Sequence, residues 1–215
     1  MSKSISLRIA EKSDYDRVIN LFREFYYKEE PLTLSHPEPG HTQDDEDFTF
    51  SFFDCGTMLF AEDDVTGMIA GALSAGPIEH GDADAMIEAA KTTETKKWRD
   101  ISLFLAYLEK KADVLHRFNV PKALHIHALG VHRDYRGLGI GEKLFNSCFD
   151  NAKRLNYPLV TTDCTSVYSI KIAERCGMEK VSLTTYEEYN RSIGEDLFHP
   201  KEPNLEIVTF AKKIC

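Results

Sequence analysis

The most constraining stretch of this chain is an apolar run that ends in an arginine and three alternating glycines. The run 123–131 mixes branched and bulky residues without helical spacing, which is typical of a strand inside a sheet. Through 140–155, apolar residues recur every three or four positions, as they do on one face of a helix. The glycines between the two runs are therefore predicted to form a turn from strand to helix.

Such a turn is suited to binding phosphate groups. Glycine lets the backbone approach a ligand closely, and the first N–H groups of the following helix point outward at the positive end of its dipole. Arg136 adds a guanidinium that can pair with two phosphate oxygens. The predicted phosphate site consists of six consecutive residues: Arg136, Gly137, Leu138, Gly139, Ile140 and Gly141.

The glycine spacing separates this turn from two other phosphate-binding motifs. A Rossmann site has G-x-G-x-x-G early in a long series of strands and helices, whereas here the spacing is G-x-G-x-G and the turn lies late in the chain. A P-loop has Gly-Lys followed by Ser or Thr, which Gly141-Glu142-Lys143 does not supply. A glycine turn that merely connects two elements is the remaining structural alternative.

The segment from Arg136 to Gly141 satisfies the Gln/Arg-x-x-Gly-x-Gly/Ala signature of the GNAT acetyltransferases. Together with the preceding strand, it resembles that family's pyrophosphate loop, which implies acetyl-coenzyme A (acetyl-CoA) as co-substrate. The resemblance also implies that the strand splays from its neighbour and that backbone groups near Leu129, Gly130 and Val131 bind the pantetheine and the acetyl carbonyl. Gly130 suits a bulge in such a strand.

The periodicity of the whole chain predicts an order of elements that matches the GNAT fold. Pro31 disfavours helical geometry at Glu30 and is expected to end the first helix there. Residues 32–47 are expected to form an exposed loop, and a polar loop is expected between the last two strands. The expected strands are 4–10, 57–62, 68–75, 123–131, 159–163, 180–185 and 207–212, and the expected helices are 13–30, 45–53, 83–118 with a break near 92–95, 140–155 and 166–176, the last closed by Gly177.

These elements predict an α/β (α+β) fold in one domain spanning residues 1–215. Its central sheet is expected to be mixed, with about seven strands flanked by helices and a splayed strand pair at the acetyl-CoA site.

Glu30 is the candidate general base. The amine that accepts an acetyl group must be neutral, yet an alkylamine is protonated at neutral pH, so a base must remove a proton. The stretch Glu29-Glu30-Pro31-Leu32 resembles the motif of the insect arylalkylamine N-acetyltransferases, in which the Glu before Pro-Leu is the base. The resemblance carries this role to Glu30. A solvated carboxylate at a helix end is the structural alternative.

Hydroxyl groups after the strand at 159–163 are the candidates for protonating the leaving thiolate. Many GNAT enzymes have a tyrosine four residues before the Gly of a Gly-Phe pair, but this chain has Ala173 there and Gly177-Met178. The segment 164–169 instead resembles the insect arylalkylamine subfamily, which implies that Ser169 and Thr165 bind or protonate the cofactor sulfur. Tyr168 is an adjacent donor. Helix capping is the alternative for the hydroxyls at this turn.

Histidine and cysteine residues are not expected to bind a metal. His125 and His127 alternate on one strand face, but no carboxylate or cysteine follows at a matching spacing, so packed histidines are favoured. His127 is a possible proton relay, and Cys164 is expected to be a buried structural thiol. The five cysteines include no C-x-x-C pair and are expected to be reduced.

Composition favours a small-molecule partner in the cytoplasm. The net charge of −9 argues against nucleic acid and mildly favours cationic ligands. The N-terminus lacks an apolar signal region, and no uncharged stretch approaches the ~20 apolar residues of a membrane span. The chain is expected to be a cytoplasmic monomer that binds neither membranes nor nucleic acid.

The resemblance therefore implies an acetyl-CoA-dependent N-acetyltransferase acting on a small primary amine by direct attack in a ternary complex. The acceptor implied is an arylalkylamine such as dopamine, serotonin, tryptamine or tyramine. Polyamine, agmatine or histamine acetylation would use the same motifs, and acceptor choice is expected to depend on residues 32–53 and 98–107. A non-catalytic acyl-CoA-binding sensor is the alternative from another functional class.

Overall fold

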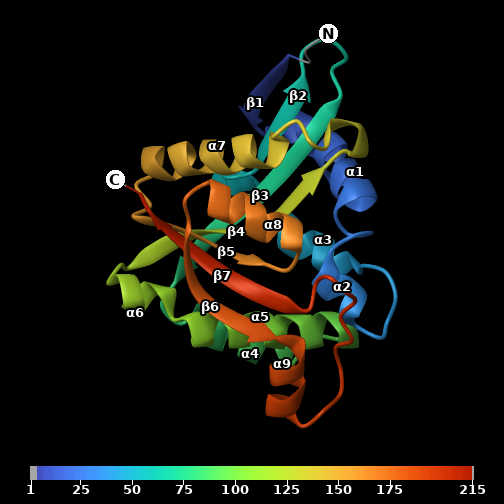
Figure 1. The fold of residues 1–215 in the computed structure, drawn as a ribbon, viewed down its shortest axis with the longest axis vertical. Coiled ribbons are helices and arrows are strands. Elements are labelled where there is room, and N and C mark those ends of the chain that lie inside the picture. Colours follow the sequence, from blue (N-terminus) through green and yellow to red (C-terminus); the bar gives the residue numbers. More distant parts are fainter. Residues whose placement is uncertain (1–3, 215) are drawn as a thin grey trace.

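A single mixed sheet organises the computed structural model, which describes residues 4–214 (Figure 1). The spatial order of its seven strands is β1-β2-β3-β4-β5-β7-β6. Among the strand pairs of the described residues, only β4–β5 is parallel. The predicted mixed seven-stranded sheet is therefore confirmed. The strands are β1 (Ile5–Ile9), β2 (Leu59–Asp63), β3 (Ile69–Glu79), β4 (Lys122–Val131), β5 (Leu159–Cys164), β6 (Glu179–Thr185) and β7 (Glu206–Lys213).

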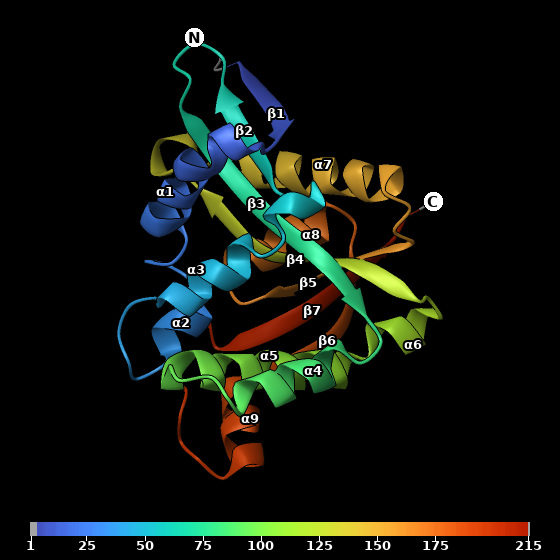
Figure 2. The same cartoon turned by 180° about the vertical axis from the view of Figure 1, so that it is seen from behind.

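Helices cover both faces of this sheet. Helices α7 and α8 lie over one face in Figure 1, and α1 and α3 lie over the other face in Figure 2. None of the helices described is long and apolar enough to cross a membrane. The helices are α1 (Tyr15–Phe25), α2 (Pro31–Ser35), α3 (Gln43–Phe50), α4 (Asp82–Ala90), α5 (Lys96–Ala112), α6 (Val114–Phe118), α7 (Ile140–Arg154), α8 (Val167–Arg175) and α9 (Tyr186–Ile193).

The alternation of side chains along the strands divides the core into layers. On β2, Leu59 and Ala61 pack in the cluster beneath α7 and α8, while Phe60 between them packs in the cluster beneath α1 and α3. A third cluster joins α5, α9 and α2 around Phe104 and Tyr186, both fully buried. The site-bearing helices α1, α2, α5, α7 and α8 are thus each anchored by apolar packing.

Strands β4 and β5 separate part-way along their length. They pair only from Leu124 opposite Val160 to Ile126 opposite Thr162. Beyond Ile126, β4 continues to Val131 and stays paired with β3 as far as Gly71. Within residues 4–214, the β5-facing side of β4 therefore has no strand partner after Ile126, which confirms the predicted splay.

The segment after Pro31 differs from the expected exposed loop. Residues Pro31–Ser35 form α2, with Leu32 and Thr33 buried, and α3 begins at Gln43. Proline suits the first position of a helix because its missing N–H needs no partner there. The Glu30 side chain accepts the next free N–H groups, those of Leu32 and Thr33. Helix α1 ends at Phe25, earlier than predicted.

Two further elements differ from the predicted pattern. Residues 186–193 form α9 instead of a polar loop, and its first turn is capped by Thr185, whose Oγ1 accepts the Glu188 N–H. The predicted break near 92–95 is confirmed, and a second break occurs at Asp113, which has a φ of 44°. Gly177 follows α8 with a φ of 69°, as predicted for a left-handed helix end.

Gly71 on β3 sets how closely α7 approaches the sheet. A Cβ at this position would lie 2.8 Å from Ile140 Cγ2 and 3.0 Å from the Gly130 carbonyl oxygen. We expect Gly71→Ala to lower the free energy of unfolding by about 1–3 kcal/mol, measured by urea denaturation. In an Ile140→Ala background the loss should be smaller, because the nearest clash is gone. An equal loss in both backgrounds would contradict this account of the contact.

Candidate active site

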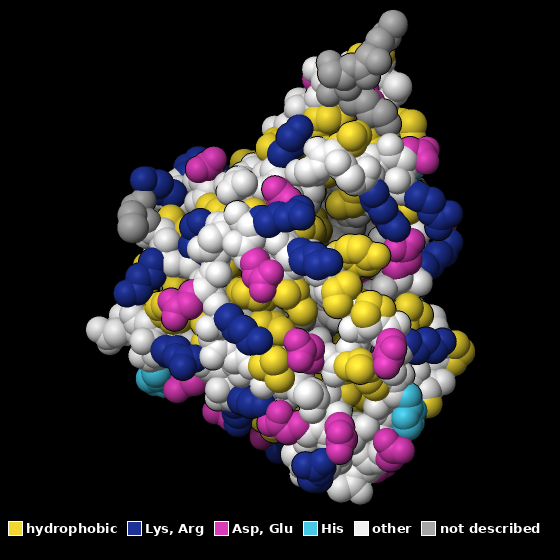
Figure 3. Space-filling view, viewed as in Figure 1, with side chains coloured by type: hydrophobic (Ala, Val, Ile, Leu, Met, Phe, Trp, Pro, Cys, Tyr) yellow, Lys and Arg dark blue, Asp and Glu magenta, His cyan; other side chains and the backbone are white. Residues whose placement is uncertain are grey.

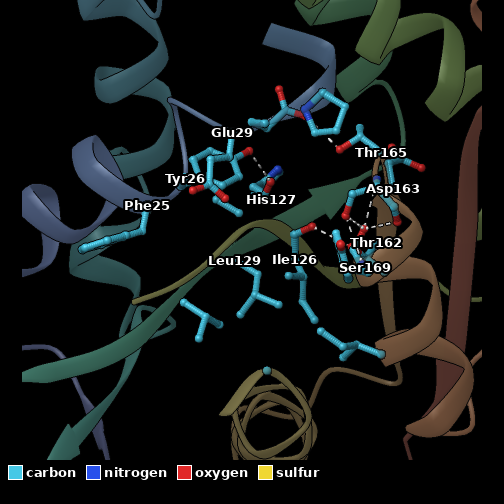
Figure 4. Close-up of a pocket in the computed structure, with 18 of the residues that line it drawn as sticks. Phe25, Tyr26, Glu29, Ile126, His127, Leu129, Thr162, Asp163, Thr165 and Ser169 are labelled. Carbon is cyan, nitrogen blue, oxygen red and sulfur yellow. Dashed lines mark hydrogen bonds between the residues drawn. The ribbon is translucent and has the colours of Figure 1, made fainter. Parts of the chain in front are cut away.

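A cavity of about 870 Å³ opens where β4 and β5 separate. Its walls come from the loop after α1, from α2, α3 and α5, from β4 and β5, from the beginning of α7, and from α8 as far as Arg175. Figure 4 shows lining side chains from α1, the loop after it, β4, β5 and the beginning of α8 around one space. The cavity joins the predicted phosphate turn to the predicted base.

The predicted phosphate turn forms one end of the cavity. Gly137 and Gly139 have φ values of 75° and 72°, a conformation that favours glycine. Gly141 has a different role, because a Cβ there would lie 2.6 Å from Ile172 Cδ1 of α8. Of the six predicted residues, all except Leu138 line the cavity, and Leu138 is exposed.

The basic side chains at this end are paired with carboxylates. Arg136 donates to Glu29 Oε2 (2.8 Å), and Arg175 of α8 donates to Glu142 Oε1 (2.9 Å). Figure 3 shows basic and acidic side chains interspersed over the face of the molecule that is seen in Figure 1. An anion bound at the turn therefore competes with Glu29 for Arg136.

Strand β4 lines the cavity continuously from His125 to Leu129. Leu129 and Val131 line it, but Gly130 does not. The predicted bulge at Gly130 is wrong, since Gly130 pairs regularly with Ala72 and the β3–β4 register shifts between Ser74 and Ala75 instead. Gly130 meets a packing requirement, because a Cβ there would lie 3.1 Å from Leu21 Cδ2 of α1.

Glu30 is buried beside the cavity, with 8% of its surface exposed. Its Oε1 accepts the Leu32 N–H (2.9 Å) and the Thr165 hydroxyl (2.7 Å), and its Oε2 accepts the Thr33 N–H (2.6 Å). Glu30 therefore caps α2 and is also bonded across the cavity to the segment before α8. The solvated carboxylate considered as its alternative is wrong.

The other predicted hydroxyls line the same cavity but have different neighbours. The Ser169 hydroxyl donates to the Ser166 carbonyl (2.9 Å), and the two side chains form the capping box that begins α8. Tyr168 lies at the cavity rim with 75% of its surface exposed. The structure brings Thr165 into contact with Glu30, whereas within residues 4–214 neither Ser169 nor Tyr168 is hydrogen-bonded to that carboxylate.

Aromatic rings form the opposite wall of the cavity. The Phe48 ring lies 5.2 Å from Trp98 and 5.0 Å from His127, between ring centroids. Phe52 stacks on His127 at 4.5 Å, and Tyr26 donates a long hydrogen bond to the His127 carbonyl (3.4 Å). Phe48 and Phe52 come from one region predicted to select the acceptor and Trp98 from the other, whereas Tyr26 and His127 lie outside both regions.

Burial favours the neutral forms of His125, His127 and Cys164. Burial lowers the pKa of His125, and it lowers the pKa of His127 well below its usual value. Burial raises the pKa of Cys164 to about 12, as expected for a structural thiol. Within residues 4–214, no group of three or more His, Cys, Asp or Glu residues is arranged to hold a metal ion. Cys215 lies outside the described residues.

Several cavity residues were not predicted. Asp45 is the third residue of α3, where it completes a capping box with Thr42, and that pattern alone predicts a cap. Lys171 and Arg175 are one helical turn apart on α8, a spacing that indicates a shared face. Asp163 and Asn204 carry no local signal, because only the sheet and the loop before β7 bring them to the cavity.

The comparisons with known proteins agree with this geometry. Residues 15–178 match the Acetyltransferase (GNAT) family. The chain belongs to that family. It is an N-acetyltransferase of the GNAT fold, and acetyl-CoA is its co-substrate.

Solved structures of insect enzymes resemble the chain over nearly its whole length. A mosquito arylalkylamine N-acetyltransferase-like protein, 5b, is 42% identical with a TM-score of 0.94, covering 98% of this chain and 100% of that one. A Drosophila melanogaster polyamine N-acetyltransferase, which catalyses the formation of N-acetylagmatine, is 31% identical with a TM-score of 0.91, covering 98% and 100%. An Aedes aegypti arylalkylamine N-acetyltransferase 2 is 22% identical (TM-score 0.89, covering 98% and 99%) and shows the shared fold.

The position of Arg136 at the glycine turn generates a prediction for cofactor binding. Arg136→Gln should raise the KM for acetyl-CoA by about tenfold, because a charge-assisted pair with phosphate is lost. The KM for S-acetylpantetheine, which lacks the diphosphate, should be unchanged. Initial rates with each donor measure both values. A parallel rise for the two donors would contradict a phosphate role for Arg136.

Proposed function

We propose that this N-acetyltransferase acetylates a small primary amine by direct attack in a ternary complex, with Glu30 as the general base. The observation that carries the proposal is that Glu30 lines the same cavity as the glycine turn and is held there by Thr165. A fixed carboxylate in a cavity shared with the cofactor turn meets the geometric requirement for a general base.

Glu30 retains capacity to accept a proton from the amine. A carboxylate offers about four acceptor positions, and Leu32, Thr33 and Thr165 occupy three of them. The remaining position can accept from the ammonium or from a water between them. Thr165 acts in this scheme by orienting the carboxylate, so it is a positioning residue.

Acetyl-CoA supplies the activated acetyl group. We propose that residues 136–141 hold its diphosphate and that the unpaired edge of β4 near Leu129, Gly130 and Val131 binds its pantetheine through backbone groups. The splay after Ile126 supports this assignment, because it leaves that edge without a strand partner. Backbone N–H groups aimed at the developing oxyanion would stabilise the transition state.

The leaving thiolate is stable enough to depart but benefits from a proton. We assign this donation to Ser169, whose hydroxyl lines the cavity at the first turn of α8. The Ser169 hydroxyl can rotate, so that it donates to the sulfur in place of the Ser166 carbonyl. Tyr168 is the alternative donor, at the more exposed rim.

Two acceptor classes suit the walls of the cavity. The Phe48, Trp98 and His127 rings favour the flat side of an arylalkylamine, and the mosquito relative supports that class. Aromatic faces also bind cationic chains, and the Drosophila relative supports the agmatine and polyamine class. A second carboxylate at the acceptor end, Asp45, favours the latter class.

A panel of aryl and alkyl amines tests the activity directly. Thiol release from acetyl-CoA should require an added primary amine and should be absent with a matched alcohol, which is a poorer nucleophile. Binding of coenzyme A without turnover of any amine would contradict the proposal and would indicate an acyl-CoA sensor instead.

Replacing the base tests its role. Glu30→Gln should lower kcat/KM by about 10²- to 10⁴-fold, because general base catalysis is lost. Its residual rate should rise with pH toward the pKa of the amine, since only free amine then reacts. Coenzyme A affinity, measured by calorimetry, should not change.

Glu24→Gln is the matched control, because Glu24 is an exposed carboxylate on α1 paired with Lys28. This variant should keep the wild-type rate and pH profile. A Glu30→Gln enzyme with those same properties would exclude Glu30 as the base.

A further inference from the structure

The acceptor end of the cavity contains a buried carboxylate, Asp45, that the proposed acetyl transfer does not use. Asp45 is 6% exposed and lines the cavity from α3. Its Oδ2 accepts the Thr42 N–H (2.6 Å) and the Thr42 hydroxyl (2.8 Å). Within residues 4–214, no hydrogen bond to its other oxygen, Oδ1, is present. One oxygen is thus sufficient for the helix cap, and the other is available to a ligand.

The carboxylates of Asp45 and Glu30 influence the same neighbouring side chains electrostatically. Burial raises the pKa of the Tyr26 hydroxyl, and Glu30 and Asp45 both raise that pKa further. Both carboxylates also favour the charged form of Lys97, although burial lowers the pKa of this lysine overall. The two carboxylates therefore lie within electrostatic range of common neighbours.

Among the residues that line the cavity, carboxylates outnumber the cationic side chains, which are Arg136, Lys171 and Arg175. Glu30, Asp45 and Asp163 line the cavity, while Lys97 is turned to the Glu38 carbonyl (2.9 Å) and the Gly40 carbonyl. Burial lowers the pKa of His125 and of His127, which favours their neutral forms. The positive charges of Arg136 and Arg175, at the cofactor end, are paired with Glu29 and Glu142.

An amine with a single positive charge leaves part of this excess negative charge uncompensated. Its ammonium group pairs with Glu30, and the cation then left near Asp45 is Lys97, whose ammonium donates to the Glu38 and Gly40 carbonyls and not to this carboxylate. An unpaired buried carboxylate is costly, whereas a charge-assisted hydrogen bond to it is favourable. Phe48, three residues after Asp45 and facing the same cavity, offers an aromatic surface on which a cationic chain can lie.

We propose that Asp45 binds a second positive charge on the acceptor, so that the enzyme prefers primary amines with an ammonium or guanidinium at the far end. The acceptor end is then selective for dications over monoamines of equal size. The inference rests on the proposed acetyl transfer and identifies Asp45 as the specificity-determining residue.

The test compares 1,5-diaminopentane with hexylamine, in which a methyl group replaces the second ammonium. In the wild-type enzyme, kcat/KM should favour the diamine by about tenfold or more, beyond the statistical factor of about two from its equivalent amines. Asp45→Asn should reduce kcat/KM for the diamine by about tenfold and change that for hexylamine less than about threefold.

Asp47→Asn is the matched control, because Asp47 is an exposed carboxylate on the same helix that accepts from Gln43 (2.8 Å). Asp47→Asn removes one negative charge, as Asp45→Asn does. It should leave the ratio of kcat/KM for 1,5-diaminopentane to kcat/KM for hexylamine at the wild-type value. Asn at position 45 retains an oxygen that can accept the Thr42 N–H. If Asp45→Asn does not fold, Asp45→Ser, whose hydroxyl can also accept that N–H, makes the same comparison.

A wild-type ratio near the statistical factor would overturn the inference, as would a ratio that Asp45→Asn leaves unchanged. Turnover of arylalkylamines but of neither test amine would overturn it while leaving the acetyl transfer intact. Failure to acetylate any amine despite binding of coenzyme A would refute the proposed function itself, and the assignment of Asp45 with it.

Discussion

The separation of β4 from β5 after Ile126 is the constraint on which the site depends. Three paired positions hold the strands together, and beyond them the sheet opens while β4 remains paired with β3. The opening leaves one edge of β4 without a strand partner and creates the cavity. Helices α7 and α8 then begin beside this opening, so the phosphate turn and the hydroxyl-bearing segment both line the cavity.

Glu30 connects the two sides of that opening. Its carboxylate accepts two N–H groups of α2 and the hydroxyl of Thr165, so one side chain caps a helix and is aligned toward the cavity. Capping and catalysis are compatible here, because the bonds that stabilise α2 also restrict the rotamers of the proposed base. Ser169 and Asp45 follow the same pattern, since each belongs to a capping box and lines the cavity.

The sequence predicted the features that depend on local pattern. The strand, glycine turn and helix around Arg136 have clear periodicity and an unusual glycine spacing, and the structure places them as expected. Helix α2 was missed because glutamate is an uncommon cap and a five-residue helix has no measurable periodicity. The bulge was misplaced because glycine in a strand indicates either a bulge or a close contact, and only the packing of Leu21 decides which. Asp163 and Asn204 reach the cavity through long-range topology, which no short pattern encodes.

A crystal structure of the enzyme with coenzyme A tests the central claim most directly. The account predicts the diphosphate at residues 136–141 with Arg136 released from Glu29, the pantetheine along the unpaired edge of β4, and the sulfur at the part of the cavity lined by Glu30 and Ser169. Coenzyme A bound elsewhere, or with its sulfur remote from Glu30, would contradict the account.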